Sequence, residues 1–304
     1  MNIDVSCLGS IYRGSLASEF RQSINSLLFG GLRPSEIVVV VDGPISSELD
    51  YVLCGYVDNG RVNAIRLSSN RGLGPALRVG LEACSHEIVC RFDTDDINLE
   101  GRLAALVAQF HSGSQGVDVV SSSILEFEDS SSPVVRCRVK RSLVTHRDLS
   151  AGLDFRNTLN HPAVAFRKSS VINVGSYEDV PFFEDYFLWL KLRKAGFCFA
   201  GIDQPLVCMR RASSSLRRRS GFRYFLFELG FVARSFKRRL LPLRSLPFML
   251  ARALTRLLPS SVQSFQDFLP WRGRPLECCN PAQAVTVSFD ALNLRSHVTN
   301  SEKG

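Results

Sequence analysis

The chain has 304 residues, of which 45% are apolar and 10% aromatic, so it can build a real core and is not a disordered tail protein. Nine Cys without C-x-x-C spacing exclude a zinc ribbon and a secreted disulfide framework, and a reducing cytosol fits best. The formal charge of +8 indicates an anionic partner, while no apolar run approaches the roughly 18 residues of a membrane span, so we expect neither export nor a transmembrane anchor.

The first 125 residues alternate between the periodicities of strands and helices. Strands are predicted at residues 3–8, 36–41, 62–67, 87–92 and 117–121, and helices at about 16–28, 46–56, 75–84 and 99–111. The Ile-Val-Val-Val-Val run at residues 37–41 is apolar on both faces, as a central parallel strand requires. This alternation predicts βαβ units, so we expect an α/β fold with a mostly parallel central sheet flanked by helices.

In such a sheet, ligands bind where the strands end at their carboxyl sides. One group in this position is Asp93-Thr94-Asp95-Asp96, which contains three acids and directly follows an apolar strand. Three carboxylates crowded together are unfavourable unless a cation lies between them, and oxygen ligands without nearby Cys or His favour Mg²⁺ or Mn²⁺. A solvated acidic turn that caps the next helix is the alternative, and the residues alone leave it open.

Two further loops end predicted strands. The segment Ser69 to Pro75 contains Arg71 between polar and Gly residues and opens a helix, an arrangement that suits a phosphate or a base. It lacks the ending of a Walker A loop, and an ordinary capped loop is the alternative. Asp42 precedes Gly-Pro and can accept hydrogen bonds from a nucleobase or a ribose, or simply serve the turn.

Glu184 and Asp185 form an acidic pair inside an aromatic stretch, residues 182–189. A carboxylate among aromatic side chains is partly desolvated, which makes it a better general base. The alternative is a pair of acids that interact with the dipole at the start of a helix. His161 lies in a polar turn, and as a lone His it ranks below the acids as a catalytic candidate.

The charge is unevenly distributed along the chain. Residues 206–259 contain thirteen Lys and Arg and one acid, which gives this arm a charge of +12 and leaves the remainder at −4. Two apolar helices with basic flanks are predicted, at residues 222–241 and about 248–258, and such helices can lie in an anionic membrane surface. The alternative is a pair of helices that pack on the catalytic domain with a solvated basic face.

These motifs, in this order, resemble the family 2 glycosyltransferases of the GT-A fold. The match is closest to the bacterial branch that builds capsular polysaccharide, amylovoran-type exopolysaccharide and O-antigen, and it covers about residues 3–207. The segments that carry it are Ser10-Ile11-Tyr12, EIVVVVDGP at 36–44, Asn70 to Gly74, RFDTDDI at 91–97, Asn160-His161-Pro162 with Phe166-Arg167-Lys168, and Phe183 to Trp189.

The resemblance implies a role for each candidate residue. Tyr12 belongs to the first nucleotide loop, Asp42 contacts the base, and Arg71 lies in the second loop. Asp93 and Asp95 would form the DxD that binds metal and diphosphate, and Asp96 would assist or contact the sugar. Asp185, in its pair with Glu184, would deprotonate the acceptor hydroxyl, and a single displacement would invert the anomeric carbon.

We therefore expect an inverting glycosyltransferase that moves a sugar from a nucleotide sugar, with a UDP-sugar as the expected donor, to a polyprenyl-diphosphate-linked or glycan acceptor. We expect it in the cytoplasm, peripheral on the inner face of the cell membrane, with no nucleic-acid partner. The expected division is a GT-A catalytic domain at 1–207, a basic amphipathic helical membrane-associating region at 208–270 and a flexible tail at 271–304.

Two other functions were weighed. A basic nucleic-acid-binding protein is suggested only by the net charge and the Arg clusters, and the acidic body and the lack of a recognised motif speak against it. A nucleotidyltransferase would keep the fold and change the reaction, and the Glu184-Asp185 pair beside an acceptor segment disfavours it.

Overall fold

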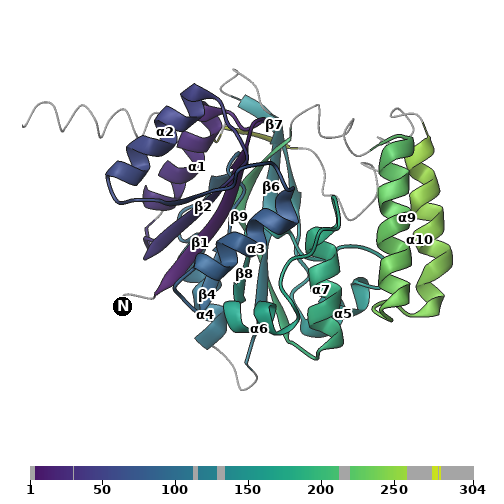
Figure 1. The fold of residues 1–304 in the computed structure, drawn as a ribbon. Helices are drawn as coiled ribbons and strands as arrows, with labels where there is room; N and C mark the ends of the chain where they lie inside the picture. Colours follow the sequence, from purple (N-terminus) through teal and green to yellow (C-terminus); the bar gives the residue numbers. More distant parts are fainter. Residues whose placement is uncertain are drawn as a thin grey trace, which may run out of the picture.

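The computed structural model describes residues 4–29, 31–111, 116–128, 134–211, 220–258, 276–279 and 281. They form a curled ten-stranded sheet with helices on both faces and a helical hairpin at one end (Figure 1). The strand order is β10-β7-β6-β8-β4-β1-β2-β3, and β9 pairs with β6 and β5. The expected α/β architecture is therefore confirmed.

The first half of the chain builds the parallel part of the sheet. Its strands are β1 (Val5–Tyr12), β2 (Glu36–Asp42), β3 (Asn63–Arg66) and β4 (Ile88–Arg91), joined through α1 (Ala17–Phe29), α2 (Ser47–Asp58) and α3 (Leu73–Ala83). Strands β2 and β4 pair with β1, and β3 with β2, all in parallel. Apolar runs on β1, β2 and β4 bury both faces, which is why the positions of these three strands could be predicted, whereas β3 at the edge of the sheet has no buried residue.

The second half makes the sheet mixed rather than mostly parallel. It contains β5 (Ile97–Asn98), α4 (Arg102–His111), β6 (Val119–Glu128), β7 (Val134–Lys140), α5 (His146–Gly152), the short helix His161–Ala163, β8 (Val164–Arg167), α6 (Lys168–Asn173), α7 (Glu184–Lys194) and β9 (Phe199–Arg211). Strand β8 runs antiparallel between β4 and β6. Strand β10 (Leu276–Cys279) pairs with β7, although the sequence predicted only a flexible tail there; the rest of 271–304, except residue 281, lies outside the described residues.

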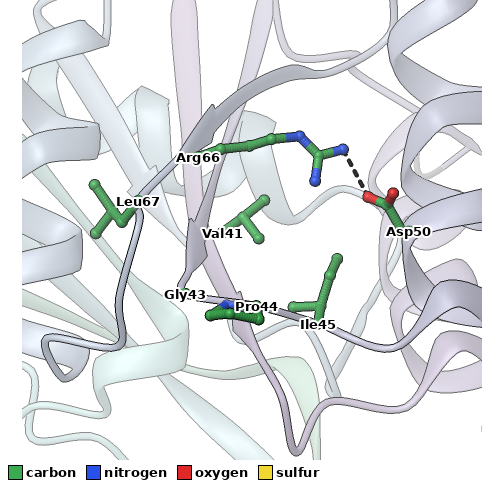
Figure 2. A pocket seen from close by; sticks show the side chains of 7 residues that line it. All are labelled: Val41, Gly43, Pro44, Ile45, Asp50, Arg66 and Leu67. Atoms are coloured by element: carbon green, nitrogen blue, oxygen red, sulfur yellow. Dashed lines mark ion pairs between the residues drawn. The ribbon is translucent and has the colours of Figure 1, made fainter.

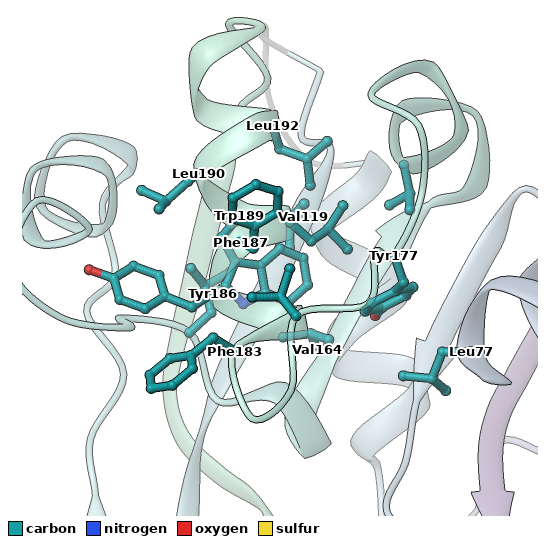
Figure 3. Close-up of a cluster of buried hydrophobic side chains, with 14 of the residues drawn as sticks. Leu77, Val119, Val164, Tyr177, Phe183, Tyr186, Phe187, Trp189, Leu190 and Leu192 are labelled. Carbon is teal, nitrogen blue, oxygen red and sulfur yellow. The ribbon is translucent and has the colours of Figure 1, made fainter. Parts of the chain in front are cut away.

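Side chains on the two faces of the sheet form two separate cores. One face packs against α1, α2 and α4, and the other against α3, α6 and α7. The second core is rich in aromatic residues from α7, among them Phe187 and Trp189, both fully buried (Figure 3). Because side chains alternate along a strand, Leu8 and Val89 face α7, whereas Cys7 and Cys90 face the opposite layer.

The helices α9 (Phe222–Lys237) and α10 (Leu246–Leu254) form a hairpin that packs beside α7 (Figure 1). The ring of Phe231 stacks on Phe183 at 4.7 Å between centroids and lies 4.9 Å from Tyr186. Within the hairpin, Glu228 is fully buried and accepts hydrogen bonds from Arg252 Nε at 2.5 Å and Arg256 Nε at 2.9 Å. None of the described helices is long and apolar enough to cross a bilayer.

The pairing of Glu228 with two arginines predicts a large effect on stability. Glu228→Ala leaves two guanidinium groups, each less than a quarter exposed, without their counter-charge, so we expect a loss of about 3–5 kcal/mol in the free energy of unfolding. Urea denaturation followed by circular dichroism measures it. Glu48→Ala, an exposed acid of α2, serves as the control and should change stability by less than about 0.5 kcal/mol; equal effects of the two changes would contradict the prediction.

Candidate active site

The candidate site begins where β1 and β2 end. Tyr12 and Asp42 are partners in the register of these two strands, so their side chains emerge next to each other at the carboxyl edge of the sheet. Tyr12 is 40% exposed, which leaves its ring open to a ligand, whereas Asp42 is buried. The structure thus brings together two residues that are separated by 30 positions in the sequence.

Asp42 holds the loop that follows β3. Its Oδ1 accepts a hydrogen bond from the Arg71 backbone N–H at 2.7 Å and its Oδ2 one from Gly72 at 2.9 Å. Gly43 has φ +82°, and a Cβ there would lie 2.5 Å from the Asn70 backbone nitrogen, so the close approach of the two loops requires glycine. The sequence did not predict this organising role. Contact of Asp42 with a base stays a prediction, as does a ligand role for the exposed Arg71 side chain.

A small hollow opens beside this turn. Figure 2 shows its lining, which combines Val41, Pro44, Ile45 and Leu67 with the ion pair of Arg66 and Asp50. The Arg66 Nη2 and Asp50 Oδ1 atoms are 2.6 Å apart. Neither charged residue was a candidate in the sequence, because a single cation at a strand end and a single acid in a helix carry no distinguishing pattern.

Three carboxylates converge after β4. Ligand oxygens of Asp93, Asp95 and Asp96 all lie within 4.8 Å of one another. The turn that carries them is anchored on both sides, since Ser23 Oγ donates to the Asp93 carbonyl at 2.9 Å and Thr94 Oγ1 donates to the Ser10 carbonyl at 3.0 Å. These two hydrogen bonds therefore hold the predicted acidic cluster in place at the edge of the sheet.

The electrostatics of this cluster fit a divalent cation. Partial desolvation, together with the charges of Asp93 and Glu19, raises the pKa of Asp95 to about 6. Burial and the charges of Asp95 and Asp93 raise the pKa of Asp96 well above its usual range. Asp96 Oδ1 accepts from the Arg210 backbone N–H at 2.8 Å, while its Oδ2 is buried without a partner among the described residues. A buried, unpartnered carboxylate oxygen beside two further acids is a donor set for Mg²⁺ or Mn²⁺.

Arg91 lies beneath the carboxylates and was not among the predicted site residues. It is 1% exposed, points to the same face as Val89, and donates from Nη2 to Asp93 Oδ1. Its Nε and Nη1 have no partner among the described residues. Arg102, also buried, donates to the carbonyls of Arg91 and Pro162. The one available signal was a charged residue at the end of an otherwise apolar strand.

The acidic pair begins α7. Asp185 Oδ2 accepts from Asn157 Nδ2 at 2.7 Å, and its Oδ1 accepts from the Tyr186 N–H at 2.6 Å, so the carboxylate is oriented on both sides. Glu184 packs against Gly74 of α3, where a Cβ would lie 3.1 Å from Glu184 Cβ and 2.4 Å from the Glu178 carbonyl oxygen. Asn157 was missed because a single Asn in a turn has no distinctive pattern.

His161 and Tyr177 form a buried pair near these acids. His161 Nε2 lies 3.1 Å from the Tyr177 hydroxyl. Burial, reinforced by the charge of Arg91, lowers the pKa of His161 to about 4, while Asp185 and Asp93 act in the opposite direction. The charges of Arg91, Asp93 and Asp185 all act on the Tyr177 hydroxyl as well. Both side chains of this buried pair are therefore within electrostatic range of Asp93 and of Asp185.

The buried, neutral His161 predicts acid sensitivity. At pH above about 6.5 the ring is neutral in both states, and between 6.5 and about 4 only the unfolded state binds the proton. Protonation of His161 in the unfolded state is thus expected to lower the free energy of unfolding by about 3 kcal/mol as the pH falls from 7 to 4. Urea denaturation across this range should show wild type losing more stability than His161→Gln by that amount; parallel curves would mean that the pKa of the ring is the same in the folded and unfolded states.

Solved structures identify the fold. The chain superposes on Staphylococcus aureus TarS 1-349 in complex with UDP-GlcNAc with a TM-score of 0.57 at 17% identity, covering 84% of this chain and 72% of that one. It superposes on the mannosyltransferase PcManGT from Pyrobaculum calidifontis, in complex with GDP-Man and Mn²⁺, with a TM-score of 0.54 at 16% identity, covering 95% and 80%. The fold is that of the GT-A glycosyltransferases.

Sequence comparison gives the family. The chain belongs to glycosyl transferase family 2, whose profile matches residues 11–174. It is 32% identical over 261 residues to the amylovoran biosynthesis glycosyltransferase AmsE of Erwinia amylovora, covering 86% of this chain and 96% of that protein. It is 30% identical to the Escherichia coli UDP-Gal:alpha-D-GlcNAc-diphosphoundecaprenol beta-1,3-galactosyltransferase, covering 86% and 94%. The resemblance stated from the motifs is confirmed, and the reaction is glycosyl rather than nucleotidyl transfer.

Proposed function

We propose that this enzyme is an inverting, Mg²⁺- or Mn²⁺-dependent glycosyltransferase that moves a sugar from UDP to a lipid-linked acceptor in bacterial surface-glycan biosynthesis. The observation that carries the proposal is the cluster of Asp93, Asp95 and Asp96 at the edge of the sheet, beside an α7 that begins with the oriented carboxylate of Asp185. The names of the relatives support the pathway, since one is an amylovoran enzyme and another uses UDP-Gal and a diphosphoundecaprenol-linked acceptor.

The nucleotide would bind at the ends of β1, β2 and β3, with Tyr12 against the base, Asp42 at its edge and Arg71 near the phosphates. Asp93 and Asp95, with Asp96 assisting, would hold the cation. When bound, the cation would neutralise charge on the departing diphosphate. Arg91 keeps the Asp93 carboxylate in place from below.

Asp185 would act as the general base. It takes the proton of the acceptor hydroxyl, whose oxygen attacks the anomeric carbon of the donor sugar as the bond to the UDP oxygen breaks. The electron pair of that bond leaves with UDP, and attack from the opposite side inverts the anomeric carbon. Asn157 fixes one carboxylate oxygen by a 2.7 Å hydrogen bond, and Glu184 borders the same end of α7.

We place this reaction at the cytoplasmic face of the cell membrane, because a polyprenyl-linked acceptor is confined to the bilayer. The choice of a UDP-sugar as donor is supported by TarS, a structural neighbour that was solved in complex with UDP-GlcNAc. Which sugar is transferred depends on the shape of the pocket, and the family leaves it open.

The test is turnover of a panel of nucleotide sugars by the full chain, with a sugar-diphosphate-lipid acceptor, in the presence and absence of Mn²⁺. We expect one UDP-sugar to be consumed only with metal and acceptor present, and the product to have the inverted anomeric configuration by NMR. Turnover that is unaffected by chelator, or a product with retained configuration, would contradict the proposed mechanism.

A further inference from the structure

The hairpin of α9 and α10 exposes an apolar surface. Of the seventeen large apolar side chains that are exposed among the described residues, eight lie between residues 222 and 258. On α10 and the turn after it, exposed apolar residues recur at helical spacing. We call this set the α10 face: Pro247, Leu250, Ala251, Leu254 and Leu258. Leu254 is 56% exposed, and no charged side chain interrupts the set.

The exposed charged side chains within residues 220–258 are all positive. Between residues 220 and 258 the sequence has one acid, Glu228, and it is fully buried. Arg223, Lys237 and Arg239 are exposed, and no carboxylate of the described residues forms a salt bridge with them. An apolar helix face with a basic rim is complementary to an anionic lipid surface, where side chains enter the headgroup region and cations remain among the phosphates.

The structure also changes which residues of the arm can bind lipid. Four arginines of the hairpin, Arg238, Arg244, Arg252 and Arg256, form salt bridges with acids inside the protein. Arg234 donates to the Asp179 carbonyl at 2.7 Å. The inner face of the hairpin therefore packs on the rest of the protein, as the alternative expectation stated. On the outer face, apolar side chains must provide most of any attraction to lipid.

We propose that the α10 face docks the enzyme on an anionic phospholipid bilayer, with Arg223, Lys237 and Arg239 at the headgroups. The proposal rests on the proposed function, because a lipid-linked acceptor gives the docking its purpose. The packing of Phe231 of α9 on Phe183 places the hairpin directly beside the start of α7, so the docked enzyme holds Asp185 near the membrane surface. A symmetric pair of copies joined through this face would instead bring the same cations together.

The test is flotation of the full chain with vesicles of phosphatidylethanolamine and phosphatidylglycerol, compared with phosphatidylcholine alone. We expect binding to the anionic vesicles, and a loss of affinity of at least about tenfold in the double variant Leu250→Glu, Leu254→Glu. Tyr51→Glu, at a residue of α2 that is 80% exposed, is the matched control and should bind as wild type. Replacing Arg223, Lys237 and Arg239 by Ala should reduce the preference for anionic lipid.

Three results would overturn the docking proposal: equal vesicle binding by the double variant and wild type, no vesicle binding by folded wild type, or a dimer in solution that the double variant splits. Light scattering after size-exclusion chromatography detects the third. Failure of the proposed function is separate, since it would show vesicle binding intact but no sugar transferred. A double variant that still uses a short-chain, water-soluble acceptor while losing the bilayer-bound one would support docking directly.

Discussion

Asp185→Asn is expected to lower kcat by about 10²- to 10⁴-fold while leaving UDP binding unchanged. The amide keeps the size of the side chain but cannot take a proton from the acceptor hydroxyl. The proposed UDP site lies at the ends of β1 to β3, and no hydrogen bond connects Asp185 to Tyr12, Asp42 or Arg71 in the described part of the chain. Single-turnover kinetics for transfer, and calorimetry for UDP with Mn²⁺, measure the two effects.

Glu184→Gln is the matched control for this experiment, because Glu184 is the neighbouring acid on the same helix. If Asp185 is the base, the Glu184 variant should retain kcat within about tenfold. Loss of both transfer and UDP binding in Asp185→Asn would show that the base has been misplaced, and a larger loss in Glu184→Gln would assign the role to Glu184. Asn157→Ala removes the hydrogen bond to Asp185 Oδ2 and should lower kcat more than it changes KM.

Asp95→Asn is expected to weaken binding of Mn²⁺ in the presence of UDP by about tenfold to hundredfold and to lower kcat/KM by at least about a hundredfold. The ligand oxygens of the three carboxylates lie within 4.8 Å of one another, and Asp95 is the exposed one of the three residues. Its replacement therefore removes a metal ligand with little effect on the fold. Electron paramagnetic resonance of Mn²⁺ measures the affinity without depending on turnover.

Two comparisons sharpen the assignment of the metal ligands. Glu100→Gln changes an exposed acid a few residues away and should leave Mn²⁺ binding as it is. Asp96→Asn tests the third carboxylate, whose buried Oδ2 has no partner among the described residues. If Mn²⁺ binding survives in Asp95→Asn and is lost in Asp96→Asn, the DxD assignment to Asp93 and Asp95 is wrong.

Most of the parallel half of the fold could be predicted because β1, β2 and β4 bury both faces and carry mainly apolar runs, which are unbroken in β2. The later strands lack that signal. Strand β6 carries the consecutive buried residues Ser121, Ser122 and Ser123. The hydroxyls of Ser121 and Ser123 accept hydrogen bonds from the distant backbone N–H groups of Asn160 and Ser142. Strand β9 has a register shift against β6, so its pattern follows no single period.

The candidate site was predictable where function concentrates acids at strand ends, as at Asp93 to Asp96. What could not be predicted is which charges are turned inward. Arg91 and Arg102 are buried beneath the site, and Glu228 is buried in the hairpin, although charged residues are rarely buried. Arg102 donates to carbonyls 11 and 60 residues away in the sequence, and Glu228 accepts from arginines 24 and 28 residues away, which a periodicity within one element does not reveal.

Gly74 has a consequence for how such enzymes can be recombined. It is the contact point between α3, which opens after the nucleotide loop, and the segment that leads to Asp185, and a side chain there would collide with the Glu178 carbonyl oxygen at 2.4 Å. The donor half and the acceptor half are thus spaced by a residue that has no side chain. Chimeras that exchange these halves between relatives should assemble productively only when position 74 stays glycine, whatever sugar specificity each half brings.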